Sequence, residues 1–499
     1  MDLARIRSGA IDMLPDEQEA ELRRGMSRQE TRDPYIVGWD GDDDPENPFN
    51  WPSWKKWTIT ILVALVTFNV AFGSSAFTAG MPDIEVEFGA SNTVITLGVT
   101  FYLLGFAFGP LLYAPLSEIY GRKPIAIYPW IIFMAFQIGC ALSHNTATLL
   151  VSRLIAGFAG ASPITNAGAT LGDMFVPAER GTPMSFYTIA PFMGPVFGPI
   201  VGGFVSEYVS WRWTFWIVLI MSGVMFIGQL LCPETYGRTL LARKAARLRK
   251  ETGNMNLHAA HEIGQASQWE VIKNNISRPV VMLCTEPIVF LFALYCAIIY
   301  AILYMDFIAY PIVYQEERGW SAGIGGLPFL GVGIGMWIGI ATSGHQTTIY
   351  IRLTKQRNKG IYPEARLPYA IAGAIAIPIG IFWFGWTSIR SVHWIVSILS
   401  GIPFGFGMCT VYICSFAYLV DAYLMYAASS LAANSLLRSI FGACFPLFAR
   451  QMYENLEPKW ASTLVGGIAA LAAPIPLLFY KYGESIRMRS VRLPETSKV

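Results

Sequence analysis

The sequence predicts an all-α membrane protein with twelve transmembrane helices in two six-helix halves. Hydrophobic residues make up 54% of the 499 residues, and charged residues only 14%. An average soluble domain has about 25% charged residues. Apolar windows of about 20 residues recur along the chain and match the thickness of a bilayer core. One long polar connection separates these windows into two sets of six.

The predicted spans divide the chain into five regions. We expect spans at about 57–80, 93–115, 124–143, 147–170, 184–205, 213–232, 285–309, 324–344, 367–388, 394–418, 428–449 and 461–480. The regions are a disordered N-terminal arm (1–56), an N-terminal half (57–232), a central linker with an amphipathic helix (233–284), a C-terminal half (285–480) and a tail (481–499).

Basic residues are distributed unevenly between the two sides of the predicted bundle. The two termini and the loops on their side carry 29 of the 36 lysines and arginines, whereas the opposite side carries five. The remaining two, Arg153 and Arg438, lie inside spans. By the positive-inside rule, both termini and the central linker are expected to be cytoplasmic.

The fifth span contains a dense run of residues that disfavour helices. They are Gly194, Pro195, Gly198, Pro199, Gly202 and Gly203. In water each glycine costs a helix about 1 kcal/mol and each proline about 3 kcal/mol. A membrane helix tolerates them where neighbouring helices or a cavity satisfy the freed backbone groups. We expect this helix to pack closely on a neighbour, to bend and to border an internal space; close packing alone is the alternative.

Arg153 lies within the fourth span, where an arginine costs at least about 2.5–3.5 kcal/mol on insertion scales. It should therefore face a polar interior, and Gly157 allows the helix to approach a neighbour closely. We expect a fixed positive charge that lowers the pKa of a nearby carboxylate or holds a polar group of a ligand. Snorkelling of Arg153 to the membrane interface is the alternative.

The short connection between the second and third spans carries Glu118, Gly121, Arg122 and Lys123. Gly121 supplies the turn, and Glu118 can interact with a helix N-terminus, where the helix dipole favours an anion. Arg122 is expected to pair with Asp173 on the adjacent short loop. Such a cluster would latch the two halves in one state. An ordinary positive-inside anchor is the alternative.

A few further polar residues lie in or beside the spans. Asn434 and Arg438 are four residues apart in the eleventh span and should face the bundle interior, either in a structural hydrogen-bond network or in contact with a substrate. Asp421, which precedes this span, is expected either to neutralise Arg438 or to cap the start of the helix. Asp306 and Glu286, near opposite ends of the seventh span, are expected either to titrate or attract a cation, or to be solvated helix ends. Most aromatic residues of spans seven, nine and ten are expected to face lipid or to pack between helices, and a subset that faces inward would give a large apolar pocket for a bulky amphipathic ligand.

These features resemble the motifs of the major facilitator superfamily, in its fungal twelve-span drug:proton antiporter group. The run from Gly194 to Gly203 resembles the fifth-helix antiporter motif of that group. Arg153 with Gly157 resembles its fourth-helix motif, which is implicated in proton coupling. The resemblance implies the major facilitator fold, and with Asp306 these two residues are the expected proton-coupling set.

Two other stretches extend the resemblance. Residues 116–123 resemble the superfamily's loop motif, with Glu118 in place of the usual Asp and Ala114 in place of a frequent Gly. Residues 233–237 and 439–448 resemble the fungal branch, whose members export drugs, toxins, polyamines or secondary metabolites.

The resemblance implies a secondary active transporter that exports a small organic molecule by proton antiport through alternating access. A polyamine or nutrient transporter of the same fold, working by uptake or facilitated diffusion, is the alternative.

A membrane enzyme or receptor is a third class, but the sequence has no HExxH, Walker-type or GxSxG motif. We therefore expect no catalytic residue, no cofactor, no metal site and no nucleic-acid partner. The expected partners are the substrate, protons and lipid, for a monomer in the plasma membrane; the vacuolar membrane is the alternative location.

Overall fold

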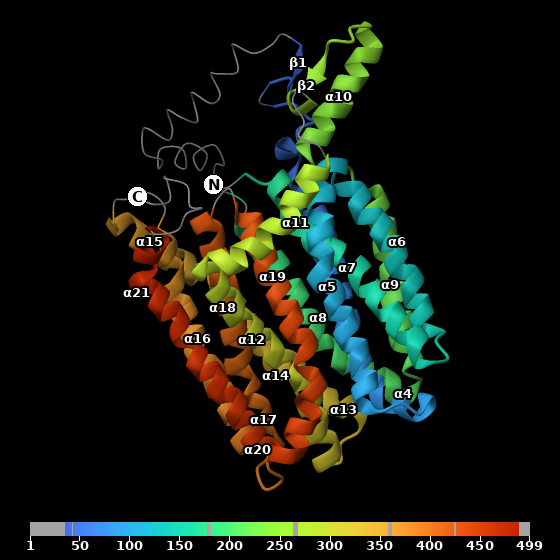
Figure 1. Cartoon of the computed structure of the whole chain (residues 1–499), viewed down its shortest axis with the longest axis vertical. Helices are drawn as coiled ribbons and strands as arrows, with labels where there is room; N and C mark the ends of the chain where they lie inside the picture. Colours follow the sequence, from blue (N-terminus) through green and yellow to red (C-terminus); the bar gives the residue numbers. More distant parts are fainter. Residues whose placement is uncertain are drawn as a thin grey trace.

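Long α-helices lie side by side along the longest axis of the molecule, and a smaller appendage stands at one end (Figure 1). The computed structural model describes residues 35–488 except 42, 177–178, 180, 263–267, 358–361 and 424–425. The first half consists of α3 (Ser53–Ser75), the 3-10 turn η3 (Ala76–Gly80), α4 (Met81–Phe88), α5 (Asn92–Tyr120), α6 (Arg122–Ala141), α7 (Thr146–Met174), α8 (Gly181–Tyr208) and α9 (Arg212–Leu231).

The second half follows two helices of the central linker, α10 (Gly237–Thr252) and α11 (Gln268–Thr285). It consists of α12 (Pro287–Tyr310), the π-helical turn η5 (Pro311–Glu317), α13 (Ala322–Gly326), α14 (Phe329–Ala341), α15 (Ser343–Arg357), the 3-10 turn η6 (Pro363–Arg366), α16 (Leu367–Thr387), α17 (Trp394–Leu399), α18 (Gly401–Tyr423), α19 (Ala427–Cys444), α20 (Pro446–Ala472) and α21 (Pro474–Met488). The described part of the chain is thus helical, as the sequence predicted, apart from one pair of two-residue strands.

Eleven helical segments of the described chain are long and apolar enough to span a membrane. The predicted eleventh span, 428–449, does not qualify, because polar residues such as Asn434 and Arg438 lower the hydropathy of α19. Even so, α19 packs inside the bundle between α12 and α5 (Figure 1). Its low hydropathy therefore reflects a helix that meets protein more than lipid.

The last apolar segment, Pro446–Met488, is 43 residues long. At about 1.5 Å per residue it would measure about 65 Å, twice the thickness of a bilayer core of about 30 Å. Glu457 has the non-helical angles φ 60° and ψ 155° just before Pro458, so α20 is broken there. The part of α20 before Glu457 follows directly from α19. The part after Glu457, together with α21, forms the last helical segment that runs along the bundle.

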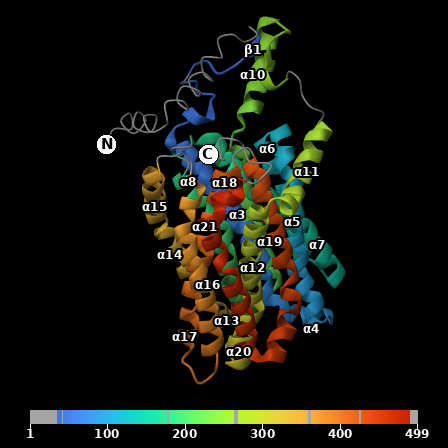
Figure 2. The same cartoon turned by 60° about the vertical axis from the view of Figure 1, so that its left-hand side comes forward.

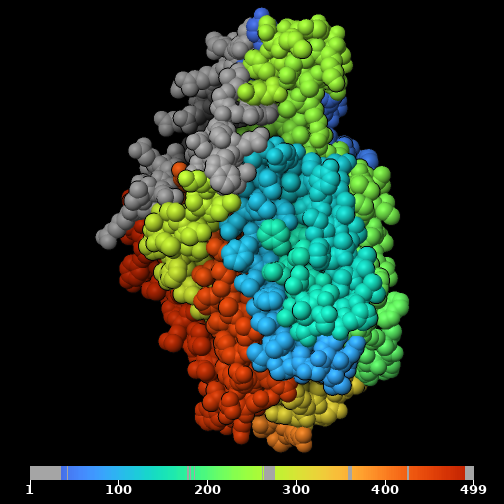
Figure 3. Space-filling model, turned by 45° about the vertical axis from the view of Figure 1, so that its right-hand side comes forward, coloured from blue at the N-terminus to red at the C-terminus, as the bar shows by residue number. Residues whose placement is uncertain are grey.

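The two halves meet where α8 and α5 of the first half contact helices of the second half. Across the interface α8 packs against α13 and α14, and α5 packs against α19. Glu207 of α8 accepts a hydrogen bond from the backbone N–H of Gly323 at 2.8 Å, and Thr100 of α5 donates one to the carbonyl of Ala443 at 2.7 Å. Figure 3 shows the halves side by side, with α11 (yellow-green) lying over both of them near one end. The halves are therefore in contact at several depths of the bundle.

The appendage joins the start of the described chain to the central linker (Figure 2). β1 (Ile36–Val37) pairs in parallel with β2 (His258–Ala259). Val37 and Ala259 bury the apolar face of α10 around Ala245. The amphipathic helix predicted in the linker is present, but its apolar face packs on protein instead of lying open to lipid.

Lys244 of α10 holds the segment that follows β1. Its Nζ atom lies 3.0 Å from Oδ2 of Asp44 and 2.8 Å from Oδ2 of Asp40. The backbone N–H of Asp40, with that of Glu46 and the Lys244 ammonium, lowers the pKa of Asp44 to about 2 despite its burial. Burial disfavours the charged form of Lys244, but its bonds to Asp40 and Asp44 outweigh this and raise its pKa. The prediction of a disordered arm over 1–56 is thus wrong for residues 35–41 and 43–56; residues 1–34 and 42 lie outside the described chain.

Candidate functional site

Arg153 is fully buried in α7, where it donates three hydrogen bonds to backbone carbonyl oxygens. Nη1 lies 2.8 Å from the oxygen of Gly73, Nη2 3.1 Å from that of Ser74, and Nε 3.0 Å from that of Gly98. The guanidinium also stacks 4.1 Å from the centre of the Tyr102 ring. Because α3 ends within two residues of Gly73 and changes into the turn η3, Arg153 clamps the end of this helix onto α5 and α7.

The prediction of a carboxylate beside Arg153 is wrong. The ion pairs formed within the described ranges do not include Arg153. Three carbonyl dipoles and the faces of aromatic rings balance its charge instead. The side chain does not snorkel to the interface either, because it has no exposed surface.

Gly157 lies at the closest approach of α7 to α5. A Cβ atom at Gly157 would overlap the backbone of Tyr102, and one at Gly105 would overlap the backbone of Phe158. The two glycines thus face each other across one helix crossing. Gly157 therefore has a packing role: it lets α7, the helix that carries Arg153, lie directly against α5.

The glycines of α8 form a stripe with a spacing of four residues. Cβ atoms at Gly194, Gly198 and Gly202 would all overlap α3 or η3, between Ala71 and Ala76. On another face of α8, Gly203 meets the carbonyl of Ala322 on α13 across the interface between the halves. The predicted close packing is present, and α8 connects the end of α3 with the second half. Pro191, Pro195 and Pro199 all lie inside this one helix.

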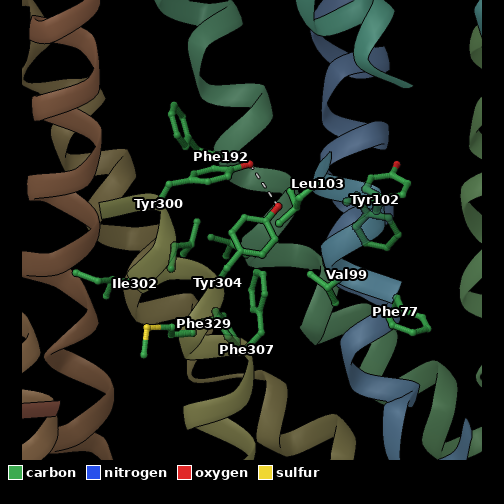
Figure 4. Packing of buried hydrophobic residues seen from close by; sticks show 14 of the residues in the cluster. Phe77, Val99, Tyr102, Leu103, Phe192, Tyr300, Ile302, Tyr304, Phe307 and Phe329 are labelled. Atoms are coloured by element: carbon green, nitrogen blue, oxygen red, sulfur yellow. Dashed lines mark hydrogen bonds between the residues drawn. The ribbon is translucent and has the colours of Figure 1, made fainter. Parts of the chain in front are cut away.

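A chain of hydroxyl groups crosses from the first half to the second beside the Arg153 clamp. Ser74 Oγ lies 2.8 Å from the hydroxyl of Tyr304 on α12, which lies 3.4 Å from the hydroxyl of Tyr300 one turn earlier. Figure 4 shows the two tyrosine hydroxyls pointing toward each other between α12 and the helices of the first half. The guanidinium of Arg438 lies 4.8 Å from the ring of Tyr300. The two arginines inside the spans are therefore linked through Ser74 and two tyrosines.

A small cavity of about 20 Å³ lies at this crossing, with walls from both halves. Such a volume admits about one water molecule. Its walls are Ala71, Phe106, Pro110, Ala161, Ile164, Pro191 and Phe192 from the first half, with Tyr300, Ser435 and Arg438 from the second. The ring of Phe192 on α8 lies 4.9 Å from that of Tyr412 on α18, so aromatic side chains of the two halves also touch. The predicted internal space beside α8 is present, in a nearly closed form.

Arg438 reaches this cavity with few partners of its own. Its side chain donates a long hydrogen bond of 3.5 Å to Ser435 Oγ and also bonds to the hydroxyl of Tyr412, while its buried Nε has no acceptor. Asn434 is fully buried, and its side chain lies beside the thiol of Cys296. The expectation that Asp421 neutralises Arg438 is wrong, because Asp421 pairs with Arg366 at 2.9 Å.

Asp306 lines a second cavity, also of about 20 Å³, inside the second half. Only 9% of its surface is exposed, and the ion pairs within the described ranges do not include it. Tyr310, Tyr453 and Ser400 are among the other polar residues of this cavity. Asp306 is therefore a buried carboxyl rather than a solvated helix end. Glu286 is also buried, and it accepts a hydrogen bond from Tyr423 at 3.1 Å.

The loop between α5 and α6 forms a compact polar network. Arg122 Nε lies 3.0 Å from Oδ2 of Asp173, as the sequence predicted. The backbone N–H groups of Arg122 and Lys123, which open α6, donate at 2.9 and 3.1 Å to the carboxylate of Glu234. Gly121 has a φ of +94°, and a Cβ atom there would overlap Glu234. The glycine is thus required both for the turn and for access of the carboxylate.

Glu118 does not occupy a helix N-terminus, which corrects that expectation. It is exposed at the end of α5, whereas Glu234 is 3% exposed and also accepts its neighbours' N–H groups at 3.0 Å. Glu234 comes 112 residues after Arg122, directly behind the sixth span. An acidic residue directly after the sixth span is the sequence signal that could have revealed this role of Glu234. Similarly, the hydroxyl of Ser74 at the end of a long apolar span is a sequence signal for the polar contact between the two halves.

We expect Glu234→Gln to destabilise the protein by about 1–3 kcal/mol, because the new amide group faces N–H donors that the carboxylate satisfied. Glu118→Gln is the matched variant and should change the stability by less than about 0.5 kcal/mol. Thermal unfolding of the two purified variants measures the difference. Equal unfolding temperatures would show that Glu234 does not cap α6.

Comparison with known proteins agrees with this architecture. Residues 63–446 match the model of the family described as the Major Facilitator Superfamily. The chain is 50% identical over 459 residues to "MFS-type efflux pump MFS2" of Trichophyton rubrum, covering 92% of this chain and 77% of that relative. It is 48% identical over 459 residues to "Major facilitator superfamily multidrug transporter mdrA" of Aspergillus fumigatus, covering 92% and 76%. "Efflux pump FUBT" of Fusarium oxysporum is 43% identical over 471 residues, covering 94% and 79%.

A solved structure shares the fold. The crystal structure of a D-xylose-proton symporter has a TM-score of 0.60 at 17% identity, covering 89% of this chain and 99% of that one. The family and the all-α membrane fold expected from the sequence are thereby confirmed. The chain belongs to the Major Facilitator Superfamily, and relatives with 43–50% identity are fungal efflux pumps and a multidrug transporter.

Proposed function

We propose that this protein is a proton-driven exporter of a small organic molecule that works by alternating access. The observation that carries the proposal is the central cavity, because both halves supply its walls. A site shared by two halves opens to one side or the other when the halves rock against each other. The names of the similar relatives support export over uptake.

In this proposal both termini are cytoplasmic and the protein is a monomer in the plasma membrane. The excess of basic residues on the side of the termini supports the orientation. The network of Arg122, Asp173 and Glu234 then lies at the cytoplasmic end and holds α6 and α7 to the start of the linker, within the first half and not between the two halves as expected. The pair of Arg366 and Asp421 takes a corresponding place in the second half, between the start of its third helix and the end of its fourth.

Asp306 is the proposed proton carrier. An ionised carboxylate without a cation is very costly to bury, so the carboxyl should hold a proton while its cavity is closed. Opening of the cavity to water would let the proton leave. Arg153 acts in this cycle by holding the end of α3, whose Ser74 bonds to Tyr304 two residues before Asp306. Gly157 contributes by keeping α7 against α5.

Purified protein in liposomes tests the proposal with three naphthyl probes: a sulfonate, a glucoside and a trimethylammonium derivative. A lumen more acidic than the bath should drive uptake of at least one probe, and an uncoupler should abolish it. A gradient of about one pH unit supplies about 1.36 kcal/mol per proton, which is about a tenfold accumulation. Uptake driven only by an acidic bath would indicate symport, and uptake indifferent to pH a facilitator; either would refute the proposal.

We expect Asp306→Asn to lose gradient-driven uptake while it still exchanges labelled for unlabelled probe, because exchange needs no net proton movement. Glu316→Gln is the matched control, since Glu316 is a carboxylate close by in sequence that pairs with Arg450 at the surface. The control should retain both activities. Gradient-driven uptake by Asp306→Asn within about twofold of the unaltered protein, a barrier change of less than about 0.5 kcal/mol, would exclude Asp306 as the carrier.

A further inference from the structure

We propose that the central cavity binds an organic anion that carries an aromatic ring, with Arg438 as the residue that recognises the negative charge. This inference rests on the proposed export function, because it names the class of substrate that the cavity would carry. Its starting point is the contrast between the two arginines that lie inside spans, Arg153 and Arg438.

The two arginines differ in how their N–H groups are used. A guanidinium has five N–H donors. Arg153 makes three hydrogen bonds of 2.8–3.1 Å to carbonyl oxygens and is fully buried. Arg438 makes a long bond of 3.5 Å to Ser435 and one to the hydroxyl of Tyr412, and its buried Nε has no acceptor. Arg153 is thus saturated by the fold, whereas Arg438 keeps donors for a ligand.

No carboxylate within the described ranges forms an ion pair with Arg438. The nearest candidate by sequence, Asp421, is held by Arg366 at 2.9 Å. The groups around Arg438 include the rings of Tyr300 at 4.8 Å and Tyr412 at 5.8 Å. A cation in membrane surroundings without an anion is costly, so a ligand that supplies the anion gains the full interaction. The same positive charge repels a polyamine, which argues against that class of substrate.

The shape of the site adds the aromatic part. Tyr300, Phe106 and Phe192 are walls of the cavity, and Phe192 lies against Tyr412 with 4.9 Å between ring centres. A planar ring fits between such faces, and a carboxylate or sulfonate attached to it can accept two parallel N–H groups of the guanidinium. Since the cavity now holds only about 20 Å³, the ligand enters when Phe192 and Tyr412 separate with the two halves.

Binding to the detergent-solubilised protein tests the anion site without any transport step. The probes are naphthalene sulfonate, naphthyl glucoside and naphthyl trimethylammonium, which share one ring system and differ in charge. Sulfonate is charged at every pH used, so a pH gradient alone does not accumulate it. We expect the sulfonate to bind at least about tenfold more tightly than the other two. Tighter binding of the glucoside or the ammonium probe would overturn the inference.

Variants at Arg438 assign the preference to that residue. We expect Arg438→Gln to weaken binding of the sulfonate about 10- to 100-fold while binding of the glucoside changes less than about threefold. Arg438→Lys keeps the positive charge but lacks the two parallel N–H donors of the guanidinium, so we expect an intermediate loss of affinity for the sulfonate. If Arg438→Gln does not fold, Arg438→Lys provides the test. Arg247→Gln, at a half-exposed arginine of α10, is the matched control and should bind like the unaltered protein.

The outcomes separate the two proposals. Unchanged sulfonate binding in both Arg438 variants would refute the anion site even if gradient-driven export of another probe is seen. Absence of gradient-driven uptake for all three probes would refute the export function, while a charge preference lost in Arg438→Gln would still establish the anion site.

Discussion

Replacing Arg153 by alanine should abolish transport and should also lower the thermal stability of the protein. The reason is that three carbonyl oxygens, of Gly73, Ser74 and Gly98, lose their donor in the interior of the bundle. Gly98 lies inside α5 and keeps the hydrogen bond of its own helix, so the cost falls on Gly73 and Ser74 at the end of α3. A buried acceptor left without a partner costs about 1–3 kcal/mol, so the total is roughly 2–6 kcal/mol. The end of α3 is then no longer held, and Ser74 moves relative to Tyr304.

Arg153→Lys is the informative companion to this variant. A lysine keeps the positive charge but cannot reach three carbonyls in a fixed fork, so it should restore stability only in part. We expect the unfolding temperature of Arg153→Ala to lie at least about 5 °C below that of the unaltered protein. The unfolding temperature of Arg153→Lys should lie between those of Arg153→Ala and the unaltered protein. A stable, fully folded Arg153→Ala protein that lacks only proton coupling would contradict the clamp and favour a purely electrostatic role.

Replacing Gly198 by valine should have the second large effect. A Cβ atom at Gly198 would overlap Ser75 Oγ and approach the backbone nitrogen of Ala76 to 2.7 Å. Backbone atoms cannot rotate away as a side chain can, so α8 must move off α3. Overpacking of this kind costs about 1–3 kcal/mol or more. We expect transport to fall below about a tenth, a loss of at least about 1.4 kcal/mol in the rate-limiting barrier.

Two glycines of other membrane helices provide controls for Gly198→Val. Added Cβ atoms at Gly223 of α9 and Gly467 of α20 would meet no atom within 4 Å. Valine at either position should leave uptake within about twofold of the unaltered protein, since no neighbour has to move. If Gly198→Val also transported at this level, the stripe on α8 would not determine how the helices pack.

The sequence predicted those features whose cause is local. The four-residue spacing of Gly194, Gly198 and Gly202 indicates a face of close packing, and the cost of a charge in the membrane indicates that Arg153 is buried. Neither pattern names the partner. That the stripe meets α3, and that Arg153 bonds to the carbonyls at the end of the same helix, depends on the tertiary arrangement.

The mistaken expectations share a physical origin. For the start of α6 the carboxylate closest in sequence, Glu118, was expected, but the structure uses Glu234. For Arg438 the nearby Asp421 was expected, but this residue lies at the end of α18 beside Arg366. Sequence distance is a poor guide to such pairs, because helix packing brings together span ends that are far apart in the sequence, such as Arg122 and Glu234.

The pairing of β1 with β2 has a consequence for how the chain is made. Ile36 meets His258, which is synthesised 222 residues later. At about 5–20 residues per second, a ribosome needs on the order of 10–40 s to bridge that interval. During this time six helices enter the membrane while the first strand waits for its partner. The contacts of the first strand are therefore complete only near Glu262, after β2, rather than at the end of the sixth span.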